Sequence, residues 1–292
     1  MNTEFNKGLL LAGFGSFWWG FIGVIYFKYV TFIGHIELVV HRCLWTTFTL
    51  FITTCLFAKW DIFLNIVKNI KYLIALFFSG LLIFINWSVW IYAISTERII
   101  DASFGYFIMP ILSVMLGYFF FKEKLNPKRI FSIILVVISI LFLIFVSFKS
   151  LPWVGLIVAL SWAFYNLVRK KIDIETDVGL FIESLFILPF ALIAFYLIVV
   201  NNFNDFDISD PPLMLLIFLA GPMTVIPLFL YVRGVELCGL GATGMIFYIT
   251  PSFQFLLGYF YYDEPFSIYK LVSFIFIWIA VIIYLKDLYE TN

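Results

Sequence analysis

The chain has 292 residues and a formal net charge of zero; 64% of its residues are hydrophobic and only 12% are charged. Soluble domains carry about a quarter charged residues, and the mean hydropathy here is +1.07, so this chain lacks the charge to cover a water-exposed surface. Its 18 basic residues are balanced by 18 acidic ones, which gives no basic surplus for a nucleic-acid partner. The composition therefore predicts an integral membrane protein.

Ten apolar stretches reach the length of a membrane-spanning helix, which needs about 20 residues. They lie approximately at residues 7–28, 36–58, 70–93, 98–121, 128–147, 150–169, 178–200, 211–233, 240–260 and 267–286. The first stretch is too long for the core of a signal peptide, so we expect it to be a retained span. Short connections leave no room for a domain outside the membrane. We predict an all-α integral membrane protein with ten transmembrane helices.

Basic residues are distributed unevenly over the connections. Of the 18 lysines and arginines, 13 lie in inner segments and 4 in outer ones if the N-terminus is inside, while Arg42 lies within a span. Because lysine and arginine concentrate on the cytoplasmic side, we predict that the N- and C-termini are both cytoplasmic.

Residues 102–125 (ASFGYFIMPILSVMLGYFFFKEKL) and 243–266 (TGMIFYITPSFQFLLGYFYYDEPF) are related sequences. At a constant offset of 141 residues they share Pro110 and Pro251, Gly117 and Gly258, and Glu123 and Glu264. The copies fall in the fourth and ninth spans, which are an odd number of spans apart and must run in opposite directions. Inverted repeats are typical of transporters. We predict two five-helix halves, residues 1–147 and 148–292, inverted around a central cavity.

Pro110 and Pro251 lie near the middle of their predicted spans. Proline removes a backbone hydrogen bond and kinks a helix, so we interpret the pair as hinges that shape the cavity. Ordinary packing kinks are the alternative. Where the copies differ (Met109/Thr250, Met115/Leu256, Ser113/Gln254), we expect residues that set substrate choice.

Ionisable side chains within spans are costly and usually face protein or water. Glu37 and His41 share a helix face, and Arg42 follows at once. They are interpreted either as a substrate-anion contact and protonation switch or as a self-contained cluster that fixes packing. Glu183 needs a partner, for which Arg42 is one candidate; Glu37, His41 and Glu183 are candidates for proton coupling.

The predicted cavity is mostly apolar with a few placed polar and aromatic groups. Nine residues are predicted to line it: Glu37, His41, Arg42, Asn86, Trp90, Tyr106, Tyr231, Tyr248 and Gln254. Trp and Tyr also anchor helices at headgroups, which is the alternative for the aromatic members. Other charged groups are interpreted as follows: the run 169–171 as a topology anchor, Arg98 with Asp101 as an interfacial ion pair, and Glu123 and Glu264 as interfacial caps or pairs.

Several signatures are absent from the sequence. It contains no Walker A motif, nucleophile–base constellation, Gly-rich dinucleotide loop or His-rich metal cluster, and its three cysteines lack metal or disulfide spacing. We expect no catalytic residues, no metal and no cofactor. An intramembrane enzyme acting on a lipid or isoprenoid substrate is the alternative, and a non-transporting receptor or structural membrane protein is a third.

Motifs in a fixed order resemble those of the drug/metabolite transporter superfamily, EamA type, and its RarD branch. They include E-x-x-x-H-R at 37–42, Asn86-Trp87, ASFGYFIMP at 102–110 and YI-x-P-x-x-Q at 248–254. The resemblance implies two inverted five-helix halves around a central cavity, and movement of metabolites or drug-like molecules across the bacterial inner membrane, often outward. Two positions depart from the pattern: Met109 replaces a frequent Asn and Phe247 an expected Gln, and both remove polarity from predicted cavity positions.

These features together predict a secondary transporter or facilitator that exports small amphipathic metabolites, such as amino acids or drug-like molecules, across the bacterial inner membrane. Alternating access of the two halves is the expected mechanism. The expected partners are a small-molecule solute and membrane lipids, not nucleic acid, and the expected assembly is a monomer or homodimer.

Overall fold

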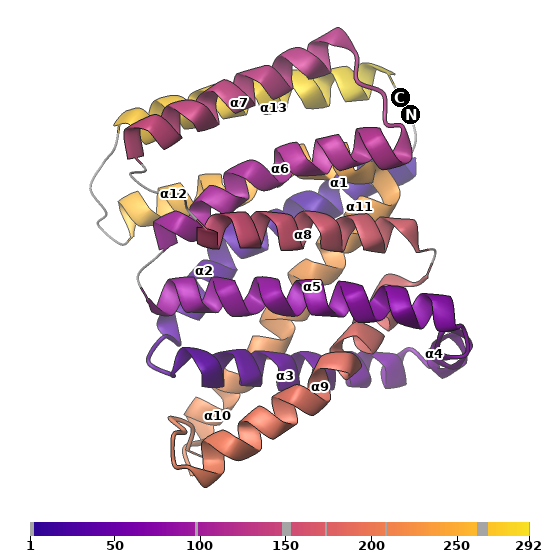
Figure 1. Cartoon of the computed structure of the whole chain (residues 1–292), viewed down its shortest axis with the longest axis vertical. Helices are drawn as coiled ribbons and strands as arrows, with labels where there is room; N and C mark the ends of the chain where they lie inside the picture. Colours follow the sequence, from indigo (N-terminus) through magenta and orange to yellow (C-terminus); the bar gives the residue numbers. More distant parts are fainter. Residues whose placement is uncertain are drawn as a thin grey trace.

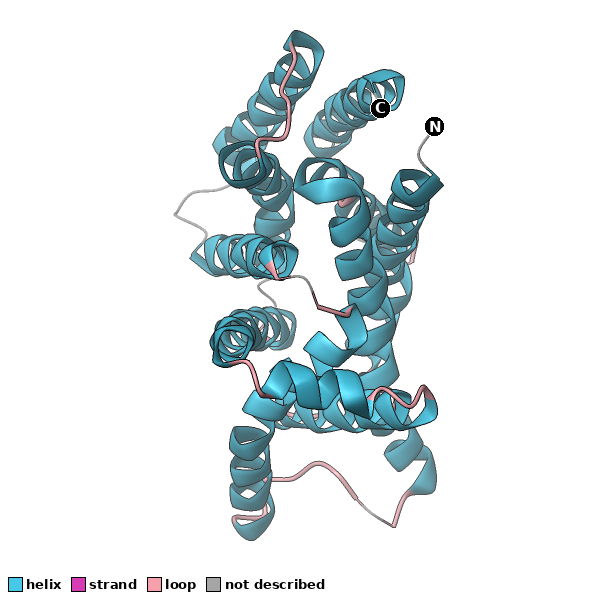
Figure 2. Cartoon of the chain, turned by 90° about the vertical axis from the view of Figure 1, so that its right-hand side faces the viewer, coloured by secondary structure: helices cyan, strands magenta, loops and turns pink. Residues whose placement is uncertain are grey.

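The computed structural model describes residues 3–96, 99–147, 153–172, 174–207, 209–261 and 268–291. Within these ranges every regular element is a helix. Most of the long helices lie across the molecule and are stacked along its longest axis, whereas α11 runs obliquely behind them (Figure 1); after a 90° turn many of the stacked helices are seen nearly end-on (Figure 2). Both views place the N- and C-termini close together, at what we call the terminal end of the bundle.

Eight helical elements form the first half of the chain. They are α1 (Thr3–Trp18), η1 (Trp19–Gly23), α2 (Val24–Tyr29), α3 (His35–Leu56), α4 (Trp60–Val67), α5 (Ile70–Ser95), α6 (Ile99–Phe121) and α7 (Pro127–Ser147). The element η1 is one wider, π-type turn inside the first span, a feature often found at functional sites. The short helix α4 was not predicted. Asn69 begins α5 by accepting a hydrogen bond from the Lys71 backbone N–H (3.1 Å), as an N-cap does.

The second half contains six helices. They are α8 (Trp153–Lys171), α9 (Thr176–Val200), α10 (Pro211–Phe218), α11 (Ala220–Ile246), α12 (Ile249–Phe260) and α13 (Ile268–Thr291). Asp210 caps α10 by accepting a hydrogen bond from the Leu213 N–H (3.1 Å), and Pro211 follows the cap, a position that suits proline because no N–H is needed there.

The helix α11 consists of two arms joined at Gly239. Gly239 has φ +86° and ψ 169°, a left-handed conformation that glycine adopts without a Cβ clash. Tyr231, before this residue, donates a hydrogen bond to the carbonyl of Thr243, after it (3.2 Å). Twelve residues of straight helix would separate these two by about 18 Å. The chain therefore folds back at Gly239, between the predicted spans 211–233 and 240–260.

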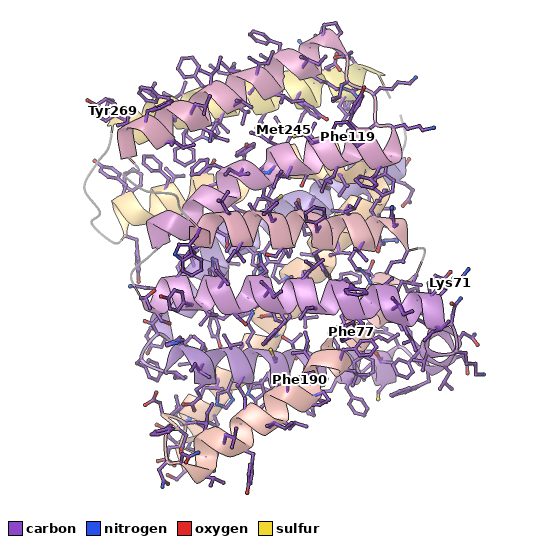
Figure 3. All side chains as sticks on the ribbon, in the orientation of Figure 1. Lys71, Phe77, Phe119, Phe190, Met245 and Tyr269 are labelled. Atoms are coloured by element: carbon purple, nitrogen blue, oxygen red, sulfur yellow. The ribbon has the colours of Figure 1, made fainter. Side chains whose placement is uncertain are left out.

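Seven continuous helical stretches of the described residues are long and apolar enough to cross a bilayer. One of them, Pro211–Leu257, has 47 residues, about twice what a membrane requires, and it contains the reversal at Gly239. Large apolar side chains cover the outer surface: Phe77, Phe119 and Phe190 are 42%, 66% and 66% exposed (Figure 3). A lipid environment accounts for this exposure, because monomeric soluble proteins rarely present such contiguous apolar surface. The protein is a multi-pass membrane protein.

Neighbouring helices come from both halves of the chain. α8 lies beside both α5 and α6, α3 packs on α9, and α7 pairs with α13 at one edge of the bundle (Figure 1). The main core therefore combines buried residues of the two halves, among them Trp87 and Met109 with Trp162, Leu228 and Phe247. This interleaving places a pocket between the halves.

Candidate functional site

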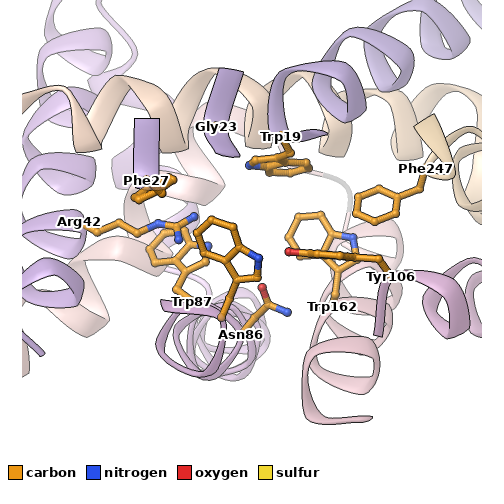
Figure 4. Close-up of a pocket in the computed structure, with 10 residues that line it drawn as sticks. Trp19, Gly23, Phe27, Arg42, Asn86, Trp87, Tyr106, Trp162 and Phe247 are labelled. Carbon is orange, nitrogen blue, oxygen red and sulfur yellow. The ribbon is translucent and has the colours of Figure 1, made fainter. Parts of the chain in front are cut away.

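A pocket lies at the centre of the bundle. It is lined by Trp19, Gly23, Phe27, Arg42, Asn86, Trp87, Trp90, Tyr106, Trp162 and Phe247 (Figure 4). Eight of these ten residues come from the first half of the chain and two, Trp162 and Phe247, from the second. The lining contains no carboxylate, and seven of its side chains are aromatic.

The two ends of the pocket have different chemistry. Arg42 lies beside Phe27 and Trp87 at one end, while Tyr106 and Phe247 lie at the other (Figure 4). Their two rings are 5.7 Å apart between centroids. Polar and apolar ends of this kind suit an amphipathic solute.

Aromatic side chains close the apolar end of the pocket. The Trp19 ring meets that of Trp162 edge to face, with centroids 5.0 Å apart, and the ring of Tyr231 packs behind both, 5.8 Å from Trp19 and 5.6 Å from Trp162. Edge-to-face arrangements are favoured by the quadrupoles of aromatic rings. Trp19 begins the wide turn η1, so the irregular part of the first span directly faces the pocket.

Arg42 is 4% exposed and is held by one hydrogen bond and three aromatic rings. Its Nε donates to Thr224 Oγ1 (3.0 Å). Its Cζ lies 4.8 Å from the ring centroid of Phe27, 4.7 Å from Trp87 and 5.7 Å from Trp90. Cation–π contacts at these distances are attractive but leave the charge unneutralised.

Asn86 joins two helices at the wall of the pocket. Its side-chain nitrogen donates to the Val158 carbonyl (3.0 Å) and to Ser161 Oγ (3.1 Å), which ties α5 to α8 across the two halves. Among the described residues, no donor is bonded to its side-chain oxygen. The site therefore combines guanidinium donors with one amide acceptor.

The open space is small. The cavity is about 40 Å³, measured as the space open to the centres of water molecules, which is room for about three waters. Pockets that bury whole ligands are about 300–1,000 Å³. The conformation is thus a narrowed one, and a solute of metabolite size requires the walls to separate.

The structure brings together four of the nine residues predicted to line the cavity: Arg42, Asn86, Trp90 and Tyr106. The other five lie outside the lining. Tyr231 packs behind the wall, and Tyr248 donates from its hydroxyl to the carbonyl of Phe107 (2.8 Å). Gln254 is partly buried, farther along α12. The repeat differences at Met109/Thr250, Met115/Leu256 and Ser113/Gln254 also lie outside the lining.

Glu37 and His41 form a separate cluster that does not include Arg42. The carboxylate of Glu37 accepts hydrogen bonds from the backbone N–H groups of Asp205 (2.6 Å) and Phe206 (3.0 Å), and it lies 3.3 Å from His41 Nε2. Glu37 therefore fixes the loop between α9 and α10. Of the predicted Glu–Arg–His cluster, the contact between Glu37 and His41 is present, but Arg42 is not part of it, since Arg42 bonds to Thr224 and lines the pocket.

Glu183 is paired with Arg169, not with Arg42. Its Oε1 lies 3.5 Å from Arg169 Nη1 and accepts a hydrogen bond from Ser79 Oγ (2.6 Å), while its Oε2 accepts one from the Tyr165 hydroxyl (3.2 Å). Arg169 is fully buried, so its interpretation as an interfacial topology anchor is corrected. The sequence did not reveal this pair because it forms where α5 packs against both α8 and α9.

Glu123 holds the second arm of α11. Its two carboxylate oxygens accept hydrogen bonds from the N–H groups of Leu240 and Gly241, each 2.9 Å long. A Cβ at Gly117, Gly239 or Gly241 would lie 2.6–2.7 Å from this carboxylate, so these glycines make room for it. Glu123 is thus a helix N-cap supplied by the other half of the chain. The side chains of Arg98, Asp101 and Glu264 lie outside the described residues.

The two predicted hinge prolines have different local settings. Pro110 lies inside α6, where the carbonyl four residues earlier loses its helical partner. Pro251 lies in the first turn of α12, just after the break at residues 247–248, instead of in mid-helix. Proline fits there because first-turn N–H groups have no helical acceptor.

Trp19, Phe27, Trp87 and Trp162 line the pocket but were not predicted as cavity residues, whereas Phe247 occupies a position that the family resemblance had placed in the cavity. Anchoring at the headgroups was the alternative for the aromatic residues that the sequence placed in the cavity. Trp19 and Trp162 lie far from both ends of their predicted spans, and that position was the available signal, since anchors belong at the interfaces.

The sequence profile of the EamA-like transporter family matches the chain twice, over residues 6–145 and again over residues 150–286. Together the matches cover most of the chain, which therefore belongs to the EamA-like transporter family and is a membrane transporter. Like its relatives, it is a RarD-like permease of the drug/metabolite transporter superfamily.

The chain is 32% identical to Protein RarD of Escherichia coli (strain K12), covering 98% of this chain and 96% of that protein. It is 34% identical to an uncharacterized transporter of Vibrio cholerae, over 97% of this chain and 93% of the relative. The uncharacterized transporter YojE of Bacillus subtilis is 31% identical over 97% of this chain and 95% of its own length. A crystal structure shares the fold with a TM-score of 0.71 and 13% sequence identity, and the match covers 96% of this chain and 97% of the chain in that structure.

Proposed function

We propose that the protein is a secondary transporter that exports small amphipathic metabolites, such as amino acids or drug-like molecules, across the bacterial inner membrane. It would work as ten spans in two inverted halves, residues 1–147 and 148–292, with both termini cytoplasmic. The observation that carries the proposal is the central pocket, whose walls include Tyr106 and Arg42 from one half and Trp162 and Phe247 from the other. A relative movement of the halves would change this pocket directly.

Contacts between repeat-equivalent positions support the inverted arrangement. Tyr106 and Phe247 are 141 residues apart, as are Phe107 and Tyr248. Members of the first pair are in contact at the apolar end of the pocket, with ring centroids 5.7 Å apart, and members of the second pair are joined by a hydrogen bond of 2.8 Å. Equivalent positions meet where a pseudo-two-fold axis passes, so these contacts support a proposed axis that runs beside the pocket.

The two ends of the bundle are closed differently. At the terminal end, Glu123 caps the second arm of α11 and Lys170 Nζ donates to the Glu236 carbonyl (2.6 Å). Arg42 lies only seven residues from the start of α3, at the opposite end of the bundle (Figure 1). If the termini are cytoplasmic, we take these contacts as the closure of the cytoplasmic side, and release of the Glu123 cap as part of the proposed transition to the other state.

Proton coupling through Glu37, His41 or Glu183 and uncoupled facilitation are the two driving modes in the proposal. Each of these residues is buried and bonded within the protein. Single variants His41→Ala, Glu37→Gln and Glu183→Gln are compared for solute export with and without a pH gradient. If one variant still exports the solute but no longer depends on the pH gradient, the substituted residue takes part in proton coupling. If all three variants keep the wild-type dependence on the pH gradient, these residues do not couple transport to protons.

The function is tested by solute flux into proteoliposomes and by a substitution that fills the pocket. Gly23 lines the pocket in helical conformation, and a Cβ there would meet ordinary contacts at 3.4 Å or more. Gly23→Leu should therefore fold and abolish flux. Gly13→Leu is the matched control in the same span, since a Cβ at Gly13 has neighbours only at 3.9–4.0 Å and lies outside the pocket. Equal flux through both variants contradicts the proposed pathway.

A further inference from the structure

We propose that Arg42 binds the anionic group of the solute, so that the protein carries amphipathic anions: a carboxylate or phosphate attached to an aromatic or apolar body. The inference rests on the proposed transport function and names its substrate class.

Arg42 has no counter-ion within the part of the chain that the structure describes. The other two buried arginines do: Arg129 Nε lies 2.8 Å from Asp287 and Arg169 Nη1 lies 3.5 Å from Glu183. The nearest acid in sequence, Glu37, is occupied by backbone N–H groups of the loop between α9 and α10. A buried cation is stable only when it is paired or solvated, so the pocket is where its partner must enter.

The guanidinium is held in place with its terminal nitrogens free for a ligand. Nε is the only nitrogen of Arg42 that donates a hydrogen bond among the described residues, and its acceptor is Thr224 Oγ1. The guanidinium carbon lies over the aromatic rings of Phe27, Trp87 and Trp90. These contacts leave the N–H groups in the guanidinium plane available as hydrogen-bond donors. The two terminal nitrogens can then form the parallel pair of hydrogen bonds that carboxylates and phosphates accept.

The rest of the pocket favours an anion over a cation. Its lining has no carboxylate to pair with a solute ammonium group. The terminal N–H groups of Arg42 donate no hydrogen bond within the described residues. Buried donors that lack acceptors are costly, so a solute rich in acceptor oxygens satisfies the site.

The test uses the full chain in lipid nanodiscs and four probes with similar apolar bodies: 3-phenylpropionate, 2-phenylethyl phosphate, 3-phenylpropionamide and 3-phenylpropylamine. Four of the nine tryptophans line the pocket, so tryptophan fluorescence reports binding. At least one of the two anions should bind about tenfold or more tightly than the amide, and the amine most weakly. The anion that binds identifies whether the site takes a carboxylate or a phosphate.

Variants separate the charge from its support. Arg42→Gln should remove the preference for the anion over the amide. Thr224→Val keeps the charge and loses only the Nε anchor, so it should weaken anion binding while keeping the preference. Arg233→Gln is the matched control, because Arg233 is 41% exposed and pairs with Glu236 outside the pocket. Thermal unfolding of each variant shows whether it is folded. If Arg42→Gln does not fold, the binding measurements are made with Thr224→Val and Arg42→Lys instead.

Equal binding of the anions and the amide by the wild-type protein overturns the inference, as does an anion preference that survives Arg42→Gln. Binding of neither anion also overturns it. Flux measurements separate this failure from failure of the transport function. If the amide or amine enters proteoliposomes and Gly23→Leu blocks its entry, the protein is still a transporter, but of a different substrate class. No flux of any probe, or flux unaffected by Gly23→Leu, counts against the transport pathway itself.

Discussion

Two buried arginines, one from each half of the chain, have opposite surroundings. Arg169 lies 3.5 Å from Glu183 and 3.7 Å from Glu236. Arg42 instead contacts Thr224 and three aromatic rings, with no carboxylate near it in the described part of the chain. The protein neutralises the first charge with its own acids and leaves the second facing the pocket.

In a membrane protein, a buried charge with a partner inside the protein is structural, whereas a buried charge that faces a pocket without a partner is available to a ligand. Removal of one member of a buried ion pair leaves the other charge uncompensated, which destabilises the fold. Removal of a cation that has no protein counter-ion leaves no such charge behind. Substitution of Arg169 should therefore reduce stability, and substitution of Arg42 should reduce solute binding.

The largest effect is expected for Arg169→Met. It leaves the buried Glu183 without its guanidinium partner, while Glu236 keeps Arg233, and we expect a loss of about 3–5 kcal/mol of unfolding free energy. Denaturant unfolding in mixed micelles measures it. The double variant Arg169→Met/Glu183→Leu should recover part of the loss because it removes a stranded charge. A single variant as stable as the wild-type protein would show that the pair is not structural.

A smaller effect is expected for Glu123→Gln, which removes the charge of a carboxylate that caps backbone N–H groups at the terminal end. The amide keeps only one acceptor oxygen for the N–H groups of Leu240 and Gly241, so we expect a loss of about 1–2 kcal/mol. Hydrogen exchange of these two amides should accelerate. Glu4→Gln in α1, an exposed acid, is the control. Unchanged exchange would mean that the cap does not hold the arm.

Tyr248→Phe tests the contact between repeat-equivalent positions. It removes only the hydroxyl that donates to the Phe107 carbonyl (2.8 Å), and the expected cost is about 1 kcal/mol. Tyr284→Phe, another buried tyrosine outside the pocket, provides the comparison. An unchanged unfolding free energy in Tyr248→Phe would show that this hydrogen bond contributes little to stability.

Arg42→Met should have the smallest effect on stability, within about 1 kcal/mol of the wild-type value, since it loses cation–π contacts and one hydrogen bond but strands no carboxylate. The same unfolding assay as for Arg169→Met makes the comparison direct. A loss as large as that of Arg169→Met would remove the distinction between the two arginines.

The sequence predicted the positions of the helices well, because runs of about 20 apolar residues have one use in a membrane. It also identified Arg42, Asn86, Trp90 and Tyr106, which carry unusual polarity or aromaticity for their spans. The partner of Glu183 could not be predicted, since Arg169 and Ser79 reach it only through the packing of three helices. Backbone features such as the wide turn η1 depend on packing and were missed for the same reason.

The central claim, that the pocket between the halves opens to each side of the membrane in turn, is tested most directly by side-specific labelling at position 23. Gly23→Cys is made in a chain whose native cysteines, Cys43, Cys55 and Cys238, are replaced by serine or alanine. We predict that an impermeant thiol reagent reacts from the side opposite the termini, and that a transported solute makes the cysteine reactive from the terminal side as well. Reaction from only one side, whatever solute is present, would contradict alternating access.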